Sequence, residues 1–377
     1  MSPRLRILHF PTNYPDPEYG QPFNMIFVAE HVRAAALHHD NVVLYISPLA
    51  SRSGRVEVTR TDEAPGRVIR IHTPHRKSEI INRLQVYRAV FVELFRLFAG
   101  GFSPHIIHVH VFSIAKIPAA LARVLHVPLI VTEHWTALCR EGALSRERLD
   151  FAKRVYEQAA IVLPVCDFLR NCIAANTAAQ LNSCIIFNAV DSKIFFHDES
   201  VRKRQILTVA RVEPAKDIPT LLRTFALLKD RNLALKIVGR GDARPFLSLA
   251  RELGIYERVE FLGEMPKVRI AELMRESSVF VLSSLWENSP CVIGESLCCG
   301  LPVAATSVGG VPELLTQSDG RLVPPSQPES MAKALEEILE NPQQFISWDI
   351  SERARARFSY EAIGTQLDEV YRGATNG

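Results

Sequence analysis

Short apolar runs alternate with helical stretches along almost the whole of this chain of 377 residues. The runs are rich in Val, Ile and Leu, as is typical of strands that are buried on both faces of a sheet. Strands joined by helices run parallel, and the helices cover the two faces. The strands expected in the first half are residues 4–10, 41–46, 67–72, 105–110, 128–132, 160–165 and 184–187. Those expected in the second half are residues 205–209, 233–238, 259–262, 279–282, 302–305 and 320–323.

Each half therefore has enough strands for one doubly wound parallel sheet, and the sequence predicts an α/β protein of two Rossmann-like domains. The length agrees with two domains, and a composition of 47% hydrophobic and 23% charged residues is that of a folded chain. We expect the first domain over residues 1–190, a linker over 191–204 and the second domain over 205–355. Two terminal helices are expected over residues 327–341 and 360–371.

Composition also excludes several classes of protein. No apolar run approaches the ~20 residues that a membrane-spanning helix needs, and the apolar part of the amino-terminal stretch is too short for a signal peptide. The seven cysteines include no Cys-x-x-Cys pair, which favours buried, reduced thiols in a cytoplasmic protein. A net charge of +3 is too small to indicate nucleic-acid binding.

The segment from 279 to 305 places two glutamates in a strand–helix–strand unit. Glu287 follows the apolar strand at its carboxyl end, where open α/β sheets bind their ligands. Ser289 is expected to cap the next helix, with Pro290 as its first residue, and Glu295 lies eight residues after Glu287, inside this helix. A carboxylate there could accept hydrogen bonds from sugar or ribose hydroxyls.

The amino terminus of the same helix also predicts an anion site. The first N–H groups of a helix have no partner within it, and they point out of its positive end. Here these groups belong to Cys291 and Val292. We expect them to contact a phosphate.

Two cations follow an earlier strand of the second half. The strand over residues 205–209 leads into a loop with Arg211 and Lys216, five residues apart. An arginine offers a planar fork and a lysine a compact charge, and both can converge on a diphosphate.

In this order, the cations and the glutamates resemble the motifs of retaining glycosyltransferases of the GT-B fold, family 4 (glycosyltransferase group 1). The resemblance implies that Arg211 and Lys216 hold the donor diphosphate, that Glu287 holds the donor sugar and that Glu295 holds the ribose. It also implies two domains that face each other across a cleft, with the donor in the second and the acceptor in the first. The final helix, within residues 356–377, would cross back to the first domain.

The resemblance assigns further backbone contacts to glycine-rich turns. This chain has Asp217 where the family usually has a glycine after the lysine. In the loop after the first strand, it keeps one glycine of an adjacent pair. The resemblance implies that Gly20 contacts the donor phosphates and that Gly263 and Met265 lie near the nucleotide base. It also implies that the turns with Gly239, Gly309 and Gly310 shape the donor pocket.

Histidines at strand ends are the remaining candidates. His134 follows the strand over residues 128–132 and resembles a family histidine that touches the transferred sugar, which implies a catalytic role beside that of Glu287. His108 and His110 share one face of a strand. A metal ion could use such a pair, but no third ligand is obvious, and we interpret them as hydrogen-bonded histidines that line a polar site. No metal is expected.

The helix expected over residues 78–98 is unusually apolar, with three arginines interspersed. It either docks on the sheet by a wide apolar face, which we favour, or lies at a lipid surface as a peripheral element. Residues 1–195 carry 22 Lys and Arg against 16 Asp and Glu. This modest excess would suit an anionic acceptor or the inner membrane surface, although a random scatter of charge explains it equally well.

The sequence thus predicts a retaining hexosyltransferase. It would move a sugar from a nucleotide-diphosphate sugar to a hydroxyl of a sugar, lipid-linked or small-molecule acceptor, in polysaccharide or glycolipid synthesis at the cell surface. We expect no cofactor, because the cations and the helix terminus can stabilise the leaving group. Two alternatives stay open: a nucleotide-sugar epimerase or phosphorylase on the same fold, and a non-catalytic nucleotide-sugar-binding partner of another transferase.

Overall fold

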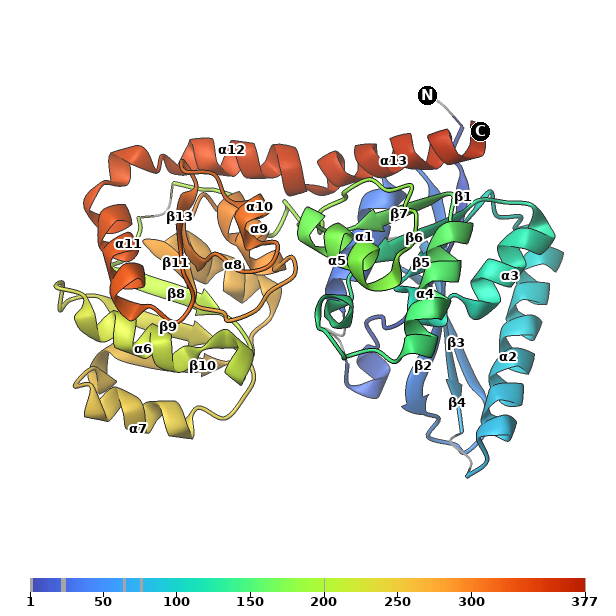
Figure 1. Cartoon of the computed structure of the whole chain (residues 1–377), viewed down its shortest axis with the longest axis horizontal. Coiled ribbons are helices and arrows are strands. Elements are labelled where there is room, and N and C mark those ends of the chain that lie inside the picture. The colour runs from blue at the N-terminus through green and yellow to red at the C-terminus, as the bar shows by residue number, and fades with distance from the viewer. Residues whose placement is uncertain (1–2, 22–24, 64–65, 75–76, 200, 377) are drawn as a thin grey trace. The chain divides into compact units, whose positions relative to one another are not determined.

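The computed structural model describes residues 3–21, 25–63, 66–74, 77–199 and 201–376. The chain forms two compact units, shown with their elements in Figure 1. The first unit comprises Met1–Ala189 and Tyr360–Gly377, and the second comprises Val190–Ser359.

The first unit is built on a seven-stranded sheet. Its strands, in spatial order, are β3 (Glu57–Glu63), β4 (Gly66–Thr73), β2 (Asp40–Ala50), β1 (Arg6–Pro11), β5 (Ile106–His110), β6 (Leu129–Glu133) and β7 (Ile161–Pro164). All neighbours are parallel except β3, which runs antiparallel to β4. Its helices are α1 (Ile26–Ala36), α2 (Glu79–Ala99), α3 (Lys116–Leu125), α4 (Arg146–Gln158), α5 (Asp167–Thr177) and α13 (Tyr360–Asn376).

The second unit has a six-stranded sheet with parallel pairing throughout. Its strands, in spatial order, are β10 (Val259–Gly263), β9 (Ala234–Val238), β8 (Gln205–Val209), β11 (Val279–Leu282), β12 (Val303–Thr306) and β13 (Gly320–Val323). Its helices are α6 (Ile218–Leu227), α7 (Arg244–Glu252), α8 (Lys267–Glu276), α9 (Cys291–Cys298), α10 (Val311–Leu314), α11 (Pro328–Glu340) and α12 (Ser347–Phe358).

One of the predicted elements needs correction, and two elements were not predicted. The strand expected over residues 184–187 does not form. The segment makes only an isolated bridge between Ser183 and Val162, although the Cys184 and Ile186 amides donate to the carbonyl oxygens of Val162 and Pro164 in β7, at 3.1 and 3.2 Å. β3 was not predicted, because its sequence alternates polar residues and lacks the apolar run of a buried strand. α12 was also missed.

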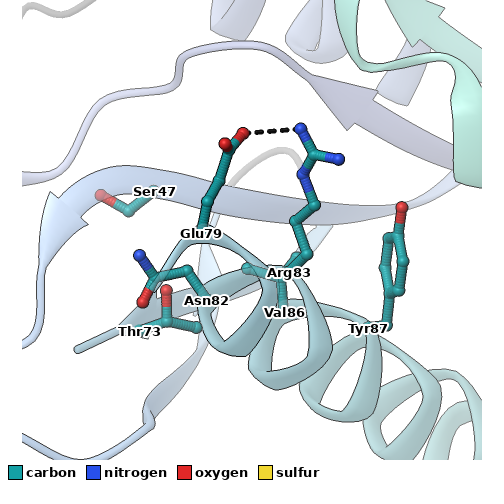
Figure 2. A pocket seen from close by; sticks show the side chains of 7 residues that line it. All are labelled: Ser47, Thr73, Glu79, Asn82, Arg83, Val86 and Tyr87. Carbon is teal, nitrogen blue, oxygen red and sulfur yellow. Dashed lines mark hydrogen bonds and ion pairs between the residues drawn. The ribbon is translucent and has the colours of Figure 1, made fainter. Parts of the chain in front are cut away.

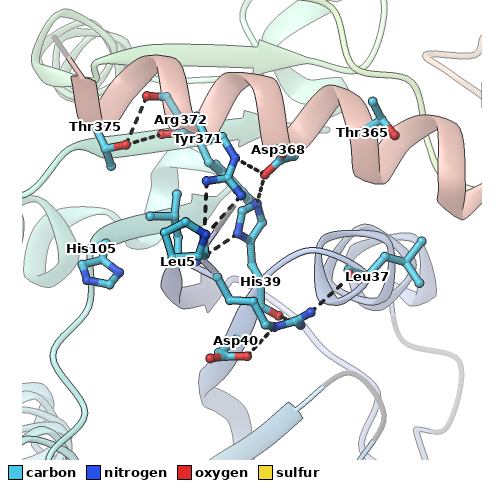
Figure 3. Close-up of polar contacts among 12 residues, drawn as sticks. Leu5, Leu37, His39, Asp40, His105, Thr365, Asp368, Tyr371, Arg372 and Thr375 are labelled. Carbon is cyan, nitrogen blue, oxygen red and sulfur yellow. Dashed lines mark hydrogen bonds and ion pairs between the residues drawn. The ribbon is translucent and has the colours of Figure 1, made fainter. Parts of the chain in front are cut away.

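The carboxyl-terminal helix α13 packs into the first unit, against α1. Gly364 makes the approach close, since a side chain there would lie 2.6 Å from the Ala34 carbonyl oxygen. Figure 3 shows the polar contacts beside it: His39 Nε2 lies 3.1 Å from Asp368 Oδ1, and Arg372 pairs with the same carboxylate at 2.7 Å. The helix is therefore part of the core of this unit.

Candidate functional site

Both sheets reverse their strand order at one point, and in such sheets the ligand lies beyond the carboxyl ends of the strands at this point. In the second unit the reversal falls between β8 and β11. The loop after β8 carries Arg211 and Lys216, and the loop after β11 carries Glu287. Three of the predicted site residues therefore extend from adjacent strands.

Lys216 and Glu287 form an ion pair, with Nζ and Oε1 2.5 Å apart. Both side chains are mostly buried, and Ser284 Oγ donates a second hydrogen bond to the same carboxylate at 2.6 Å. The Leu285 amide donates to the Ala215 carbonyl oxygen at 2.8 Å, which ties one loop to the other. The predicted diphosphate cation and the predicted sugar-binding carboxylate are thus held together.

Asp217 explains how this loop does without the glycine of the family motif. Its φ of 45° lies in the left-handed region, where glycine is favoured but aspartate is tolerated. Its carboxylate also accepts from the Thr220 amide at 3.3 Å and so caps α6. The loop keeps its turn, and the aspartate adds a helix cap.

Arg211 is exposed, and its guanidinium has no side-chain partner in the described part of the chain. The loop around it packs closely on the turn after β9. A side chain at Gly239 would lie 1.9 Å from the Ala210 carbonyl oxygen, and one at Gly241 would lie 2.5 Å from Val212 Cβ. Glycine is therefore required at position 239 for backbone packing, while its contact with a donor remains a prediction.

Helix α9 begins one residue later than expected. Pro290 is the cap, with an extended ψ of 116°, and Ser289 is not, because the first helical residue is Cys291. Cys291 and Val292 are therefore the first two residues of the helix, as the anion-site prediction requires. Glu295 is buried in this helix.

Lys267, which was not predicted from the sequence, lies beside Glu295. Its Nζ is 3.5 Å from Glu295 Oε1, and both side chains are mostly buried. Lys267 begins α8, just after the turn with Gly263 and Met265. The sequence pattern that could have indicated Lys267 is a cation in the first turn of a helix that follows a strand.

The predicted glycine turns join the loops of the site. The Gly310 amide donates to the Asn288 carbonyl oxygen at 3.0 Å, next to Glu287, and Gly309 takes a left-handed φ of 54°. The Gly239 amide donates to the Gly263 carbonyl oxygen at 2.8 Å. The turns after β9, β10 and β12 thus support one continuous rim of loops in this unit.

The first unit carries His134 directly after β6, next to a buried glutamate. Four donors surround the Glu133 carboxylate: the amides of Phe112, His134 and Trp135, at 3.1, 3.0 and 2.8 Å, and the Tyr156 hydroxyl at 2.9 Å. Burial raises the pKa of this carboxyl, while the four donors act in the opposite direction. Glu133 therefore fixes the loop that presents His134.

The Glu133→Gln variant is expected to unfold more readily, by about 1–3 kcal/mol, because an amide NH₂ would face buried donors. Chemical denaturation measures this difference. Glu141→Gln, at an exposed loop position, is the matched control and should stay within about 0.5 kcal/mol of the parent. Equal stability of Glu133→Gln and the parent would show that the four hydrogen bonds do not hold this loop.

Five buried histidines gather in the first unit: His9, His31, His108, His110 and His134. Their nitrogens form two groups of three, His9 with His108 and His110, and His31 with His110 and His134. The sequence alone did not indicate a third ligand beside His108 and His110, because the other histidines come from separate segments of the chain. Burial lowers the pKa of each of the five, so the rings are neutral at pH 7.

Gly20 lies in an exposed turn after β1, with a φ of 72°, and its amide donates to the Pro17 carbonyl oxygen at 3.0 Å. Residues 22–24 lie outside the described residues. The predicted contact of Gly20 with the donor phosphates remains a prediction.

A pocket of about 500 Å³ lies beside α2 in the first unit. Figure 2 shows its lining, which comes from the carboxyl ends of β2 and β4 and from the first turns of the helix. The lining residues are Ser47, Thr73, Glu79, Asn82, Arg83, Val86 and Tyr87. The sequence did not reveal this pocket, because its two sides are distant in the chain.

Comparison with known proteins identifies the family. The family model of the glycosyl transferases group 1 matches residues 190–363, and that of the glycosyl transferase 4-like domain matches residues 28–180. The chain is a group 1 glycosyl transferase. An uncharacterized glycosyltransferase of Methanocaldococcus jannaschii is 24% identical to it over 299 residues, which cover 71% of this chain and 75% of that protein.

Two further comparisons agree with this family. The D-inositol 3-phosphate glycosyltransferase of Corynebacterium aurimucosum is 24% identical to this glycosyl transferase over 360 residues, which cover 86% of this chain and 85% of that protein. The Anabaena protein HepE, solved in complex with UDP, superposes with a TM-score of 0.77 at 17% identity and covers 98% of this chain and 100% of its own. The predictions of a GT-B fold and of a glycosyltransferase are confirmed.

Proposed function

We propose that this glycosyl transferase moves a sugar from a nucleotide-diphosphate sugar to an acceptor hydroxyl with retention of the anomeric configuration. The observation that carries the proposal is the pair of Lys216 and Glu287 at the switch point of the second unit. The lysine offers a cation for the diphosphate, and the adjacent glutamate offers a hydrogen-bond acceptor for the hydroxyls of the sugar that is joined to it.

The electrostatics of the site suit a departing nucleoside diphosphate. Two full positive charges, on Lys216 and Arg211, follow strand β8. The first amides of α9, which carry a partial positive charge, follow the neighbouring strand β11. Such preorganised donors stabilise negative charge as it develops on a leaving group. They can do so without a metal, and we propose that the enzyme needs no cofactor.

The two glutamates would bind hydroxyl groups at different ends of the donor. We propose that Glu287 accepts hydrogen bonds from the transferred sugar and that Glu295 accepts them from the ribose. His134 would contact the transferred sugar and stabilise charge in the transition state. The Anabaena protein HepE has been solved with UDP and with UDP-glucose, which supports a donor of this kind.

Glu295→Ala is expected to weaken the binding of a ribonucleotide by roughly tenfold, because a buried carboxylate that accepts hydroxyl hydrogens is lost. A 2′,3′-dideoxy nucleotide should bind the variant and the parent equally, and calorimetric titration of both ligands measures the difference. If both ligands lose the same affinity, Glu295 supports the fold, for instance through Lys267, and does not bind ribose.

Helix α2 favours an acceptor that is presented at a membrane surface. It packs on the sheet through Val90, Leu94 and Leu97, but its opposite side exposes Ile80 and Phe91, at 71% and 70%. Exposed apolar side chains between arginines are typical of a helix that lies at a lipid surface. We propose that the pocket beside this helix receives the polar end of a lipid-linked acceptor in glycolipid or polysaccharide synthesis.

Soluble acceptors remain an alternative, because the D-inositol 3-phosphate glycosyltransferase of C. aurimucosum is named for a small phosphorylated polyol. Within the described residues, no helix has both the length and the apolar character that spanning a membrane would demand.

An assay of products tests the proposal. UDP-, GDP- and ADP-sugars are incubated with the enzyme, with and without lipid and soluble extracts as acceptors, and the sugar and the nucleotide are followed together. We expect nucleoside diphosphate and transferred sugar in equal amounts, with the donor's anomeric configuration kept. An epimerised nucleotide sugar without acceptor would identify an epimerase. A need for inorganic phosphate would identify a phosphorylase, and binding without turnover would identify a non-catalytic partner.

A further inference from the structure

We propose that His31, His110 and His134 form a site for a divalent transition-metal ion of the zinc type in the first unit. One nitrogen from each ring lies within 4.8 Å of the other two. The site is distinct from the diphosphate site of the second unit, and its existence does not depend on the proposed function.

A chain of hydrogen bonds fixes the protonation of His110. The Asn41 amide group donates to the Val32 carbonyl oxygen at 3.2 Å, so Asn41 Oδ1 faces His9 and accepts from its Nε2 at 3.0 Å. The Nδ1 atom of neutral His9 then carries a lone pair and accepts from His110 Nε2 at 3.2 Å. His110 Nδ1 is therefore left as a lone pair.

His31 also has a lone pair on its Nδ1 atom, and one hydrogen bond determines this. Its Nε2 atom donates to the Phe187 carbonyl oxygen at 2.9 Å, since a carbonyl can only accept. Its Nδ1 atom is therefore also a lone pair. Neither His31 Nδ1 nor His110 Nδ1 has a hydrogen-bond partner among the described residues, although both atoms are buried. Buried acceptors without a partner are uncommon in proteins, and a bound ion would give these two atoms one.

These contacts have the form of a prepared metal site. In metal sites the ligating histidine usually donates its other N–H to a carbonyl or a similar acceptor, which fixes the ring and the lone pair.

His134 completes the set at the edge nearest to solvent. It is 8% exposed, while His31 and His110 are 1% and 0% exposed, so an ion would arrive from its side. A tetrahedral zinc ion with bonds of about 2.1 Å holds its ligand nitrogens about 3.4 Å apart. Small rotations of the three rings would bring them to this spacing and leave a fourth position for water.

Three imidazoles select the kind of ion. Imidazole suits zinc, copper, nickel and iron, while magnesium and calcium require oxygen ligands. The other group of three is a poorer site. Both ring nitrogens of His108 are hydrogen-bonded, one with the Tyr371 hydroxyl and one with Thr132 Oγ1, each at 2.7 Å. Both nitrogens of His9 are hydrogen-bonded as well. A metal there would have to break these bonds.

A bound ion would hold His134 away from the sugar, so we expect zinc to inhibit transfer rather than to support it. This consequence rests on the proposed role of His134, whereas binding itself does not. Activity should persist in EDTA, and zinc in slight excess over the protein should lower it.

Zinc binding by the full chain, stripped with a chelator and titrated against a fluorescent zinc indicator, tests the site. We expect one ion per chain in the parent. His31→Gln should weaken binding at least a hundredfold, because a ligand nitrogen is lost. His108→Gln, which alters only the other group, and His126→Asn, which removes an exposed histidine, should each keep the parent's affinity. Retained binding in His31→Gln, or loss in His108→Gln alone, would overturn the assignment.

Cobalt provides a test that needs no variant. Co²⁺ bound to the parent should give the visible absorption bands of a tetrahedral ion with nitrogen ligands and no thiolate charge-transfer band. Absence of these bands, or a thiolate band from one of the seven cysteines, would contradict the site. Circular dichroism of His31→Gln distinguishes a lost ligand from a lost fold. Nucleotide affinity should be unchanged by zinc, so failure of this site and failure of the proposed donor site give different results.

Discussion

His134→Ala is expected to lower the rate of sugar transfer by about a hundred- to a thousandfold, as is typical when one preorganised polar group is removed from a reacting centre. The loop should survive the change, because Glu133 holds it through the backbone amide of residue 134 and through three other donors. Nucleotide affinity should change little, since its proposed determinants, Gly20 apart, lie in the second unit. Single-turnover kinetics and calorimetric titration of the same preparation measure the two quantities.

His126→Asn is the matched control, because His126 is an exposed histidine of the same unit and asparagine tolerates its left-handed φ of 53°. This control should turn over at the parent's rate. Normal turnover of His134→Ala would remove His134 from the mechanism. Loss of nucleotide binding in His134→Ala would mean that its role is structural.

Lys216→Ala is expected to weaken the binding of a nucleoside diphosphate by roughly a hundredfold. Removing one partner of a mostly buried charge pair at a binding site weakens the free energy of binding by about 2–4 kcal/mol, because the other charge is left without its partner. Here Glu287 would remain, with its Ser284 hydrogen bond but without the lysine, and it would repel the phosphates. Affinity for the nucleoside, which lacks the phosphates, should fall much less.

Two further variants separate the causes of that loss. Lys216→Ala combined with Glu287→Gln removes the repulsion and should recover part of the diphosphate affinity. Lys229→Ala removes an exposed lysine that pairs with Glu336 in the same unit, and it should have no effect. Equal losses for nucleoside and diphosphate in Lys216→Ala would indicate a folding defect and would contradict the assignment.

The sequence predicted the second unit better than the first, and the reason is physical. The strands over residues 205–209, 279–282 and 320–323 form as expected, because each is an apolar run bounded by turn residues. Lys216 and Glu287 were proposed as site residues because each lies in the loop that follows such a strand and matches a motif of the family. Local patterns were sufficient wherever a residue's position depends on the end of its own strand.

The features that were missed depend on contacts between distant segments. His9 and His110 are hydrogen-bonded although they are 101 positions apart, and Lys267 lies beside Glu295 although it begins another helix. Nothing in the pattern around either residue indicates its partner. β3 was missed for a different reason: an edge strand with a polar face has no apolar run to mark it.

Titration of UDP, GDP and ADP into the parent protein tests the central claim most directly, namely that the second unit binds the nucleoside diphosphate of a sugar donor. We expect one of the three to bind and to raise the melting temperature, because a ligand that binds only the folded state stabilises it. The matching nucleoside should bind far more weakly, and Lys216→Ala should narrow the difference by roughly a hundredfold. Failure of all three nucleotides to bind, with or without their sugars, would contradict the account.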